Sequence, residues 1–350
     1  MQARAIAVDP GFGNVKAAMV NGDVRVAVVP SVVGVGETDT GLISIGDLGR
    51  QRRRRLPDRV AFDGTTYLVG DGVARYARPV QRMDVHRLSD GPELRALLYD
   101  ALYRLLGAGE HRVALLVGLP VEVMGDRSVA QETLRGLRGW LVGEHRYRVN
   151  GEEVTVGVSH VWAMTQPAGA FFAWGLDNEG RWIRGAEMLK APIAVCDIGF
   201  NTLDLLAVEG GEVVGRFTGG DTAGMRRAAE LLINAVKAKY GITLSPHEAD
   251  ALLRRKRPRL YTTEGEVDLR PQVEQALNTA AAGIVAFVER QWGNGRQFTK
   301  LLFVGGGSRT MKDALLRQYP HGIILPDPVT ANAIGLARYG VRMQRKAGER

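Results

Sequence analysis

The segments AVDPGFGNVK, residues 7–16, and VCDIGFNTLD, residues 195–204, follow one pattern. In each, an apolar run ends at an aspartate, one residue and the dipeptide Gly-Phe follow, and a second apolar run begins. The two copies align at one constant offset, which pairs Asp9 with Asp197, Gly11 with Gly199, Phe12 with Phe200 and Lys16 with Asp204. This agreement favours a duplicated supersecondary unit over chance similarity between two short hairpins.

Each copy opens a run of three expected strands. The first run covers residues 6–8, 15–20 and 24–29, and its Asn21-Gly22 dipeptide is typical of a tight hairpin. The second run covers residues 193–196, 202–208 and 213–218, with Glu209-Gly210-Gly211 as a turn. Two related α/β halves therefore account for the chain, whose 350 residues suffice for about two domains.

Helices and further strands are expected around these two runs. The best-marked helix covers 92–106, where Pro92 suits the first turn and leucines recur at helical spacing. Ser245-Pro246-His247-Glu248 opens another helix with a capping box. The other expected helices are 128–140, 166–174, 222–240, 273–291, 309–317 and 330–339, and the other expected strands are 113–118, 154–161 and 300–304.

Both Gly-Phe turns suit phosphate binding. A glycine turn lets backbone N–H groups approach a phosphate closely, and an aspartate at a strand end can hold hydrated Mg²⁺. Lys16 is placed to neutralise phosphate charge. Gly305-Gly306-Gly307-Ser308, after the strand 300–304, can pass close to a nucleoside, although an ordinary helix-capping turn would have the same sequence. This turn matches neither the P-loop nor the Rossmann fingerprint.

Composition excludes several classes of protein. Hydrophobic residues make up 45% and charged residues 24%, as in globular domains and unlike disordered chains. The single cysteine, Cys196, excludes an intramolecular disulfide and a multi-cysteine zinc site, and we expect it to be buried. The first residues do not resemble a targeting signal, and no apolar run has membrane-spanning length. We therefore expect a cytoplasmic protein without a membrane partner.

The net charge of +8 is concentrated in three basic patches. Residues 50–59 carry +5, residues 254–259 carry +5 and residues 342–350 carry +3, which leaves −5 for the rest of the chain. Solvated loops and a frayed tail would account for them. The alternative is contact with phosphates, with an acidic adaptor or between protomers. No motif that reads DNA bases accompanies the patches, so direct nucleic-acid binding stays open.

The order of these motifs resembles the actin-like ATPase family, within the superfamily of actin, sugar kinases and chaperone ATPases. The closest resemblance is to ParM-like and archaeal actin-like proteins. Four further segments support it: Val29-Pro30-Ser31, Gly118-Leu119-Pro120, Gln166-Pro167-Ala168-Gly169-Ala170 and Ala331-Asn332-Ala333-Ile334-Gly335. The resemblance implies an α/β, actin-like ATPase fold with two ribonuclease-H-like domains flanking a nucleotide cleft.

The resemblance also implies domain boundaries. Domain I would comprise residues 1–162 completed by 330–350, with an outer subdomain at about 34–80. Domain II would comprise residues 163–329, with an outer subdomain at about 225–290. Basic patches 50–59 and 254–259 fall in these outer regions, where a protomer would meet its neighbours.

Carried over position by position, the resemblance assigns site residues. Gln166, Asp197 and Asp9 would be catalytic, with Gln166 orienting the attacking water and both aspartates organising Mg²⁺ through water. Gln166 could instead be a polar helix cap before Pro167. The nucleotide, ATP with GTP left open, would contact Gly11, Phe12, Gly13, Asn14, Lys16, Gly199, Phe200, Asn201, Thr202, Gly305, Gly306, Gly307 and Ser308. Lys237 and Lys239 would lie near the adenine.

The expected function is an ATPase that polymerises into filaments, for plasmid or DNA segregation or another prokaryotic cytoskeletal role, with itself and a DNA-binding adaptor as partners. One alternative is a small-molecule kinase of the same fold, for which Glu122 is the only acid near Gly118-Leu119-Pro120. Another is a nucleotide-dependent switch that does not polymerise. Many family members carry Ser or Thr where this chain has Phe12, which weakens the case for close sensing of the γ-phosphate.

Overall fold

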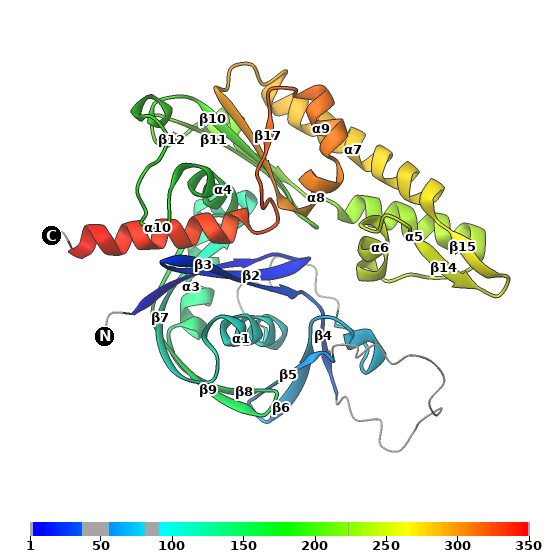
Figure 1. The fold of residues 1–350 in the computed structure, drawn as a ribbon, viewed down its shortest axis with the longest axis horizontal. Coiled ribbons are helices and arrows are strands. Elements are labelled where there is room, and N and C mark those ends of the chain that lie inside the picture. Colours follow the sequence, from blue (N-terminus) through cyan, green and yellow to red (C-terminus); the bar gives the residue numbers. More distant parts are fainter. Residues whose placement is uncertain (1–2, 37–55, 81–90, 223, 349–350) are drawn as a thin grey trace. The chain divides into compact units, whose positions relative to one another are not determined.

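The computed structural model describes residues 3–36, 56–80, 91–222 and 224–348. The chain divides into two compact units (Figure 1). The first comprises Met1–Val117 and Ser128–Ala163, and the second comprises Gly118–Arg127 and Met164–Arg350. The last helix lies in the second unit, and the expected domain boundaries, with 330–350 completing the first domain, stay a prediction. Residues 37–55, which include residues 50–55 of the first basic patch and part of the outer subdomain expected at 34–80, lie outside the described residues.

The first unit is built on a nine-stranded sheet of order β3-β2-β1-β7-β9-β8-β5-β6-β4. Its strands are β1 (Arg4–Pro10), β2 (Asn14–Asn21), β3 (Asp23–Pro30), β4 (Val33–Val35), β5 (Asp58–Phe62), β6 (Thr65–Val69), β7 (Gly109–Leu119), β8 (Gly143–Val149) and β9 (Glu152–Thr165). Strands β1, β2 and β3 form an antiparallel meander, and β1 pairs in parallel with β7. The meander places the turn after Asp9 at the end of a buried strand.

Two longer helices accompany this sheet, α1 (Pro92–Leu106) and α3 (Arg127–Leu141), with a short helix η1 (Val73–Arg75). Helix α1 has the bounds expected from the sequence. Pro92 begins it, and its leucine stripe is buried against the strands of the unit. The free energy of burying that stripe, about 1.5–3 kcal/mol for each fully buried leucine, holds the helix on the sheet.

The second unit contains a six-stranded sheet of path β12-β11-β10-β16-β17, with β13 paired to β11. Its strands are β10 (Ile193–Ile198), β11 (Leu203–Glu209), β12 (Glu212–Val213), β13 (Gly219–Asp221), β16 (Lys300–Val304) and β17 (Ile323–Ile324), and β14 (Arg259–Thr262) and β15 (Gly265–Asp268) form a separate hairpin. Strands β10 and β11 are antiparallel, and β10 is parallel to β16. The second sheet therefore repeats the pattern of β1, β2 and β7.

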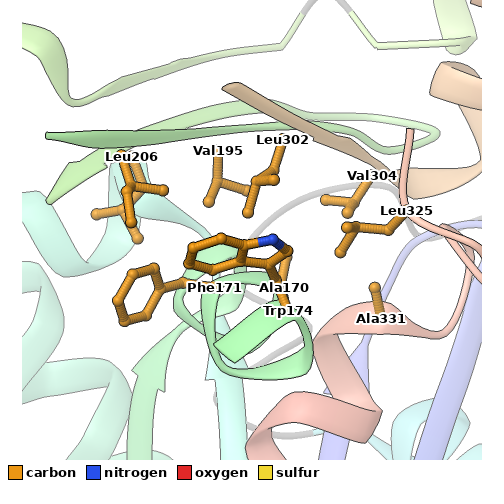
Figure 2. Close-up of a cluster of buried hydrophobic side chains, with 10 residues drawn as sticks. Ala170, Phe171, Trp174, Val195, Leu206, Leu302, Val304, Leu325 and Ala331 are labelled. Atoms are coloured by element: carbon orange, nitrogen blue, oxygen red, sulfur yellow. The ribbon is translucent and has the colours of Figure 1, made fainter. Parts of the chain in front are cut away.

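The helices of the second unit are α2 (Val121–Gly125), α4 (Gln166–Gly175), α5 (Arg226–Tyr240), α6 (Pro246–Leu253), α7 (Arg270–Trp292), α8 (Gly305–Thr310), α9 (Lys312–Gln318) and α10 (Ala331–Gly348), with short helices η3 (Ala186–Leu189) and η4 (Gly215–Phe217). Ala170, Phe171 and Trp174 of α4 pack on Val195, Leu206, Leu302 and Val304 of the sheet (Figure 2). Figure 2 also shows Leu325 and Ala331 at the edge of this core. The core fixes where α4 begins.

One expected strand is wrong in its extent. Residues 213–218 were expected to form the third strand of the second meander, but β12 ends at Val213 and η4 follows. Thr218 takes over part of the pairing, because its Oγ1 accepts from Ala207 N and donates to the Val214 carbonyl. The side chain therefore replaces a backbone partner that a longer strand would have supplied.

Arg104 bridges two aspartates within the first unit. Its Nη2 lies 2.6 Å from Asp58 Oδ2 and 2.8 Å from Asp100 Oδ2, and its Nη1 donates to the Val28 carbonyl. Burial raises the pKa of Asp100 from its ordinary value of 3.8 to about 7, while the adjacent Arg104 guanidinium acts in the opposite direction. The carboxyl group of Asp100 therefore titrates near neutral pH in the folded protein.

This shift predicts a pH-dependent contribution to stability. The folded state binds the proton of Asp100 more tightly than the unfolded chain, so its contribution is greatest below about pH 4 and declines as the pH rises towards 7. We expect the unfolding free energy of the wild type, minus that of Asp100→Asn, to fall between about pH 4 and pH 7. Urea denaturation of both proteins across this range measures the difference, and a constant difference would contradict the shift.

Candidate functional site

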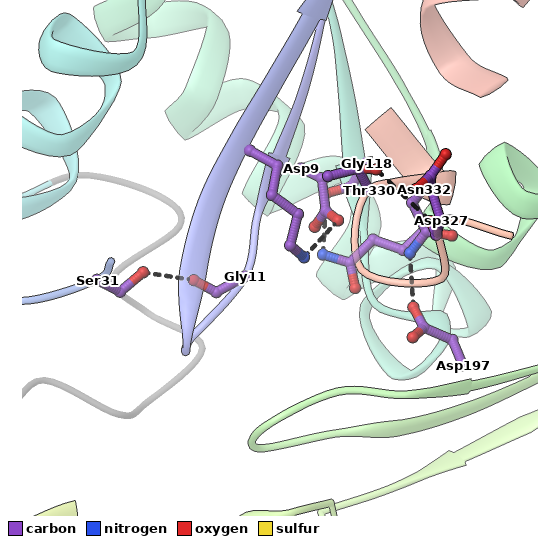
Figure 3. Close-up of polar contacts among 10 residues, drawn as sticks. Asp9, Gly11, Ser31, Gly118, Asp197, Asp327, Thr330 and Asn332 are labelled. Atoms are coloured by element: carbon purple, nitrogen blue, oxygen red, sulfur yellow. Dashed lines mark hydrogen bonds and ion pairs between the residues drawn. The ribbon is translucent and has the colours of Figure 1, made fainter. Parts of the chain in front are cut away.

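The first hairpin joins β1 to β2 around a glycine turn. Asp9 lies opposite Lys16 in the strand pairing, and Lys16 Nζ is 2.8 Å from Asp9 Oδ2 (Figure 3). The Asp9 carboxylate is almost fully buried, and Lys16 is largely buried beside it. A Cβ at Gly11 would lie 2.7 Å from the Asn14 carbonyl oxygen, so this turn requires glycine. In this conformation, the charge of Lys16 is directed at the aspartate.

Ser31 holds the turn from a neighbouring segment. Its Oγ donates to the Gly11 carbonyl at 2.8 Å, and its backbone N–H donates to the Gly13 carbonyl at 3.0 Å (Figure 3). Phe12 is buried, with 5% exposure, and therefore packs into the unit instead of presenting its ring to solvent. The exposed parts of the turn are Gly11, Gly13 and Asn14, which are partly accessible. Any phosphate contact at Phe12 would have to come from its backbone.

The second hairpin joins β10 to β11 with the same register. Ile198 pairs with Leu203, Asp197 pairs with Asp204, and Gly199 N donates to the Thr202 carbonyl at 2.9 Å. Phe200 is buried here too. In both hairpins the phenylalanine of the turn is buried. In both, an aspartate is the last residue but one of the first strand, as the sequence repeat predicts.

The beginning of α5 braces the second turn. Arg226 N donates to the Phe200 carbonyl at 2.6 Å, and Met225 N donates to the Gly199 carbonyl at 3.0 Å. The Arg226 side chain donates from Nη1 to Asn201 Oδ1 at 3.2 Å and from Nε to Glu230 Oε1 at 2.9 Å. The helix begins at Arg226, four residues after the expected start at 222, and the N–H groups of Met225 and Arg226 bond to the turn.

Asp197 lies between a helix and the triple-glycine turn. Asn332, in the first turn of α10, donates from Nδ2 to Asp197 Oδ2 at 2.6 Å (Figure 3). On the other side, a Cβ at Gly305 would lie 2.4 Å from Asp197 Oδ1, and Gly305 has a φ of 82°. Only glycine therefore lets the 305–308 turn approach this carboxylate.

The triple-glycine turn is itself helical, as α8. A Cβ at Gly307 would collide with Ile198, and one at Gly306 would meet the Arg254 guanidinium at 2.8 Å. The Ser308 side chain is fully buried, and its Oγ donates to the Gly305 carbonyl at 2.8 Å. Ser308 therefore stabilises the turn, whereas Gly305 and Gly306 form its close approaches to Asp197 and Arg254.

Gln166 is the first residue of α4 and lies over the end of β7. Its Nε2 is 3.5 Å from the Gly118 carbonyl, and a Cβ at Gly118 would meet Gln166 Cγ at 3.1 Å. The side chain is 94% buried, so its amide is held in a restricted space. The Thr165 side chain caps no backbone N–H at this helix start. Gly118 thus offers its carbonyl to the Gln166 amide and, because it has no Cβ, leaves space for the Gln166 side chain.

The structure adds residues to which the sequence analysis assigned no role in the site. Asn332 donates a hydrogen bond to Asp197, Arg226 donates one to Asn201, and Ser31 donates one to the Gly11 carbonyl. Asp204 Oδ1 accepts from Val121 N at 2.7 Å and so anchors the start of α2. Asn332 and Ser31 lie within segments that carried the family resemblance, which was the available signal. Lys237 and Lys239 are exposed in the last turn of α5, so their expected place near the adenine stays a prediction.

The donor set fits Mg²⁺ held mainly by water and phosphate. Within the described ranges, no group of three or more His, Cys, Asp or Glu side chains could hold a metal ion by itself. Asp9 and Asp197 each offer a buried carboxylate, which contacts Lys16 in the first hairpin and Asn332 in the second. Mg²⁺ suits such a site, because it keeps several waters and combines one or two carboxylates with substrate phosphates.

Two family profiles match the chain. Residues 7–169 match the N-terminal domain of actin like proteins, and residues 195–317 match the C-terminal domain described as archaeal actin homologue, MreB-like. The two hairpins fall one in each match. The chain belongs to the actin-like protein family. A search of curated protein sequences found no match to this actin-like protein.

Solved structures share its fold. The archaeal actin homologue Ta0583, in complex with ADP, has a TM-score of 0.71 at 19% identity, covering 97% of this chain and 99% of that one. A 15-stranded ParM filament from Clostridium botulinum has a TM-score of 0.74 at 20% identity, covering 98% and 100%. The actin-like protein Alp7A has a TM-score of 0.70 at 17% identity, covering 100% and 98%. At these identities the likeness shows the fold alone, which is the expected actin-like α/β fold.

Cys196, next to Asp197, is the single cysteine and is fully buried. Burial raises the pKa of its thiol, and Asp197 and Asp204 act in the same direction. The thiol is therefore a packing group and not a nucleophile. Among the described helices, none has the length and apolarity needed to cross a bilayer.

Proposed function

We propose that this actin-like protein binds Mg-ATP with both hairpins, polymerises into filaments and hydrolyses the nucleotide. The observation that carries the proposal is the repeated hairpin, with a buried aspartate before each glycine turn. In the second unit the Asp197 carboxylate lies between Asn332 and Gly305. The ADP complex of the archaeal homologue and the ParM filament support nucleotide binding and self-association for proteins of this fold.

In the proposed mechanism, Gln166 orients the attacking water. A neutral amide can donate to one partner and accept from another, which suits it to hold a water in line with a phosphate. Asp9 and Asp197 would hold Mg²⁺ through water, and Lys16, which contacts Asp9 in this structure, would neutralise phosphate charge. Bound Mg²⁺ supplies neutralisation of phosphate charge. Gly11, Gly13, Gly199, Gly305 and Gly306 provide close backbone approach.

Sedimentation with and without Mg-ATP, combined with phosphate release, tests the proposal. We expect pelletable polymer with Mg-ATP, less with Mg-ADP, and phosphate release that follows assembly. A parallel series with GTP decides the nucleotide preference. If the protein neither binds nucleotide nor pellets under any of these conditions, the proposed function is wrong. If it hydrolyses nucleotide without forming polymer, it is a non-polymerising switch.

Gln166→Ala is expected to slow phosphate release by about 10- to 100-fold while leaving nucleotide affinity within about twofold, because one positioning contact on water is lost. Single-turnover phosphate release and binding of a fluorescent ATP analogue measure the two quantities. Gln166→Glu is the matched variant, since it keeps the volume of the side chain and removes the amide donor. Unchanged turnover in both variants would show that Gln166 acts only as a helix cap.

The kinase alternative has little support at the position where a base would be needed. Glu122 lies in the first turn of α2 and is exposed, while the nearby Asp204 is engaged by Val121 N. A kinase would transfer phosphate to a small hydroxylated or carboxylated substrate and form no polymer. Stimulation of ADP production by such a compound, without pelleting, would favour it.

For the cellular role, we propose plasmid or DNA segregation, or another prokaryotic cytoskeletal task, with a DNA-binding adaptor that engages the filament. The support is the fold shared with ParM proteins. Co-sedimentation of the filament with DNA, alone and with candidate adaptors encoded beside this protein, separates direct from adaptor-mediated binding.

A further inference from the structure

The side-chain amide of Asn332 is paired at one end only. Its Nδ2 donates to Asp197 Oδ2 at 2.6 Å (Figure 3). The residue is 5% exposed, and no donor from the part of the chain that the structure describes reaches its Oδ1. An unpaired buried acceptor lowers stability, so buried amides in folded proteins usually have both ends paired. The Asn332 amide therefore serves Asp197 at the expense of its own acceptor, which an amide kept for folding alone would not need to do.

The segment that carries Asn332 also holds the triple-glycine turn. Gly305 N donates to the Pro328 carbonyl at 2.7 Å, and Pro328 lies four residues before Asn332. Gly305 is on the other side of Asp197, where a Cβ would collide with Asp197 Oδ1. The Asp197 carboxylate thus has Oδ2 directed at α10 and Oδ1 on the side of the turn. Residues 328–332 therefore position both neighbours of this carboxylate.

The same helical turn touches the helix that begins with Gln166. A Cβ at Gly169 would collide with the backbone of Asn332, and Gly169 lies about one turn after Gln166 in α4. Asn332 is also in the first turn of α10, where the partial positive charge of the helix N-terminus favours a nearby anion such as Asp197. Asn332 thus lies where α10 meets both Asp197 and the helix of Gln166, the residues to which the proposed function assigns the chemistry.

The donors that contact the two hairpin aspartates differ in charge. Asp9 contacts the ammonium group of Lys16 at 2.8 Å, whereas Asn332 gives Asp197 a neutral amide. A cation beside a carboxylate offsets its charge, while a neutral donor orients the carboxylate without offsetting that charge. The contact with Asn332 therefore fixes the Asp197 carboxylate and keeps its negative charge for a metal ion.

We propose that Asn332 is a positioning residue of the Mg²⁺ site, whose amide fixes the Asp197 carboxylate in the orientation that receives the hydrated metal ion. This inference rests on the proposed function and adds to it a residue on the last helix. Without the amide the carboxylate can rotate, so nucleotide that carries Mg²⁺ loses affinity. Nucleotide without the metal does not use the oriented carboxylate, so its affinity stays the same.

A Mg²⁺ titration of nucleotide binding tests the role of the amide. Binding of a fluorescent, non-hydrolysable ATP analogue to Asn332→Ala is measured at increasing Mg²⁺ and in EDTA. We expect the Mg²⁺ concentration for half-maximal binding to rise about tenfold, and affinity in EDTA to stay within about twofold of the wild type. Tyr319→Phe is the matched control, because it removes one hydrogen bond, to the Gly293 carbonyl, elsewhere in the second unit. Its Mg²⁺ titration should equal that of the wild type.

Exchanging the two side chains separates positioning from folding. Asp197→Asn combined with Asn332→Asp keeps a hydrogen bond between an amide and a carboxylate but moves the charge onto α10. We expect this protein to recover, in urea denaturation, the stability that either single change loses, and to keep the raised Mg²⁺ requirement. A normal Mg²⁺ titration in the exchanged protein, or in Asn332→Ala, overturns the inference. Mg²⁺-dependent binding by the wild type would still support the proposed function in that case, whereas its absence would remove both.

Discussion

Replacing Asp197 with asparagine is expected to lower phosphate release by about 100-fold or more, the largest effect on activity that the site predicts. The Asp197 carboxylate is buried, accepts from Asn332 Nδ2 at 2.6 Å and abuts Gly305. Asparagine keeps the shape of the side chain but removes the charge that would organise Mg²⁺ and water. Phosphate release under single-turnover conditions measures the effect, with nucleotide affinity measured in parallel.

Two comparisons show whether this loss is chemical. Asp9→Asn changes the equivalent carboxylate of the first hairpin, and we expect weaker Mg-dependent binding together with slower release. Asp204 lies opposite Asp197 in the strand pairing, but its carboxylate accepts from Val121 N at the start of α2. Asp204→Asn should therefore leave the chemistry largely intact. Urea denaturation of each variant checks folding. Normal turnover in Asp197→Asn, with the protein folded, would remove Asp197 from the catalytic assignment.

Gly335→Ala is expected to be the most destabilising single methyl addition in the second unit. Helices α4 and α10 cross so closely that a Cβ at Gly335 would lie 1.7 Å from the Gly169 carbonyl oxygen. The helices must separate to admit it, and overpacking of this kind costs about 3 kcal/mol. The separation would also move Asn332, three residues earlier on the same helix, away from Asp197. Chemical denaturation measures the loss of stability.

Gly283→Ala is the matched control, because it also adds one methyl within a long helix. A Cβ at Gly283 meets no atom within 4 Å, and alanine has the better helix propensity. We expect this variant to gain about 0.5–1 kcal/mol. Equal effects at the two positions would mean that the α4–α10 crossing is looser than the structure shows.

The elements that local sequence specifies were predicted well. Helix α1 has the expected bounds because Pro92 and the leucine stripe act within the helix itself. The capping box at Ser245 and Glu248 is present for the same reason. The repeat predicted that Asp9 and Asp197 are equivalent residues of the two hairpins. The structure shows each at the same register position in its own hairpin, Asp9 opposite Lys16 and Asp197 opposite Asp204.

What the sequence could not predict depends on contacts between distant segments. Asn332 on α10 lies 135 residues from its partner Asp197 on β10, so only tertiary packing brings them together. The early end of β12 depends on the Thr218 side chain, which no strand pattern anticipates. Burial of Ser308 likewise depends on the packing of α8 on β10, so its assigned nucleotide contact stays a proposal.

The contact between Asn332 and Asp197 also bears on the order of synthesis. Asp197 is translated 135 residues before its amide partner Asn332. Until α10 has been synthesised, the chain therefore holds Asp197 without Asn332 and α4 without the helix that crosses it. A protein truncated before residue 331 would carry both Gly-Phe turns yet lack the amide that donates to Asp197.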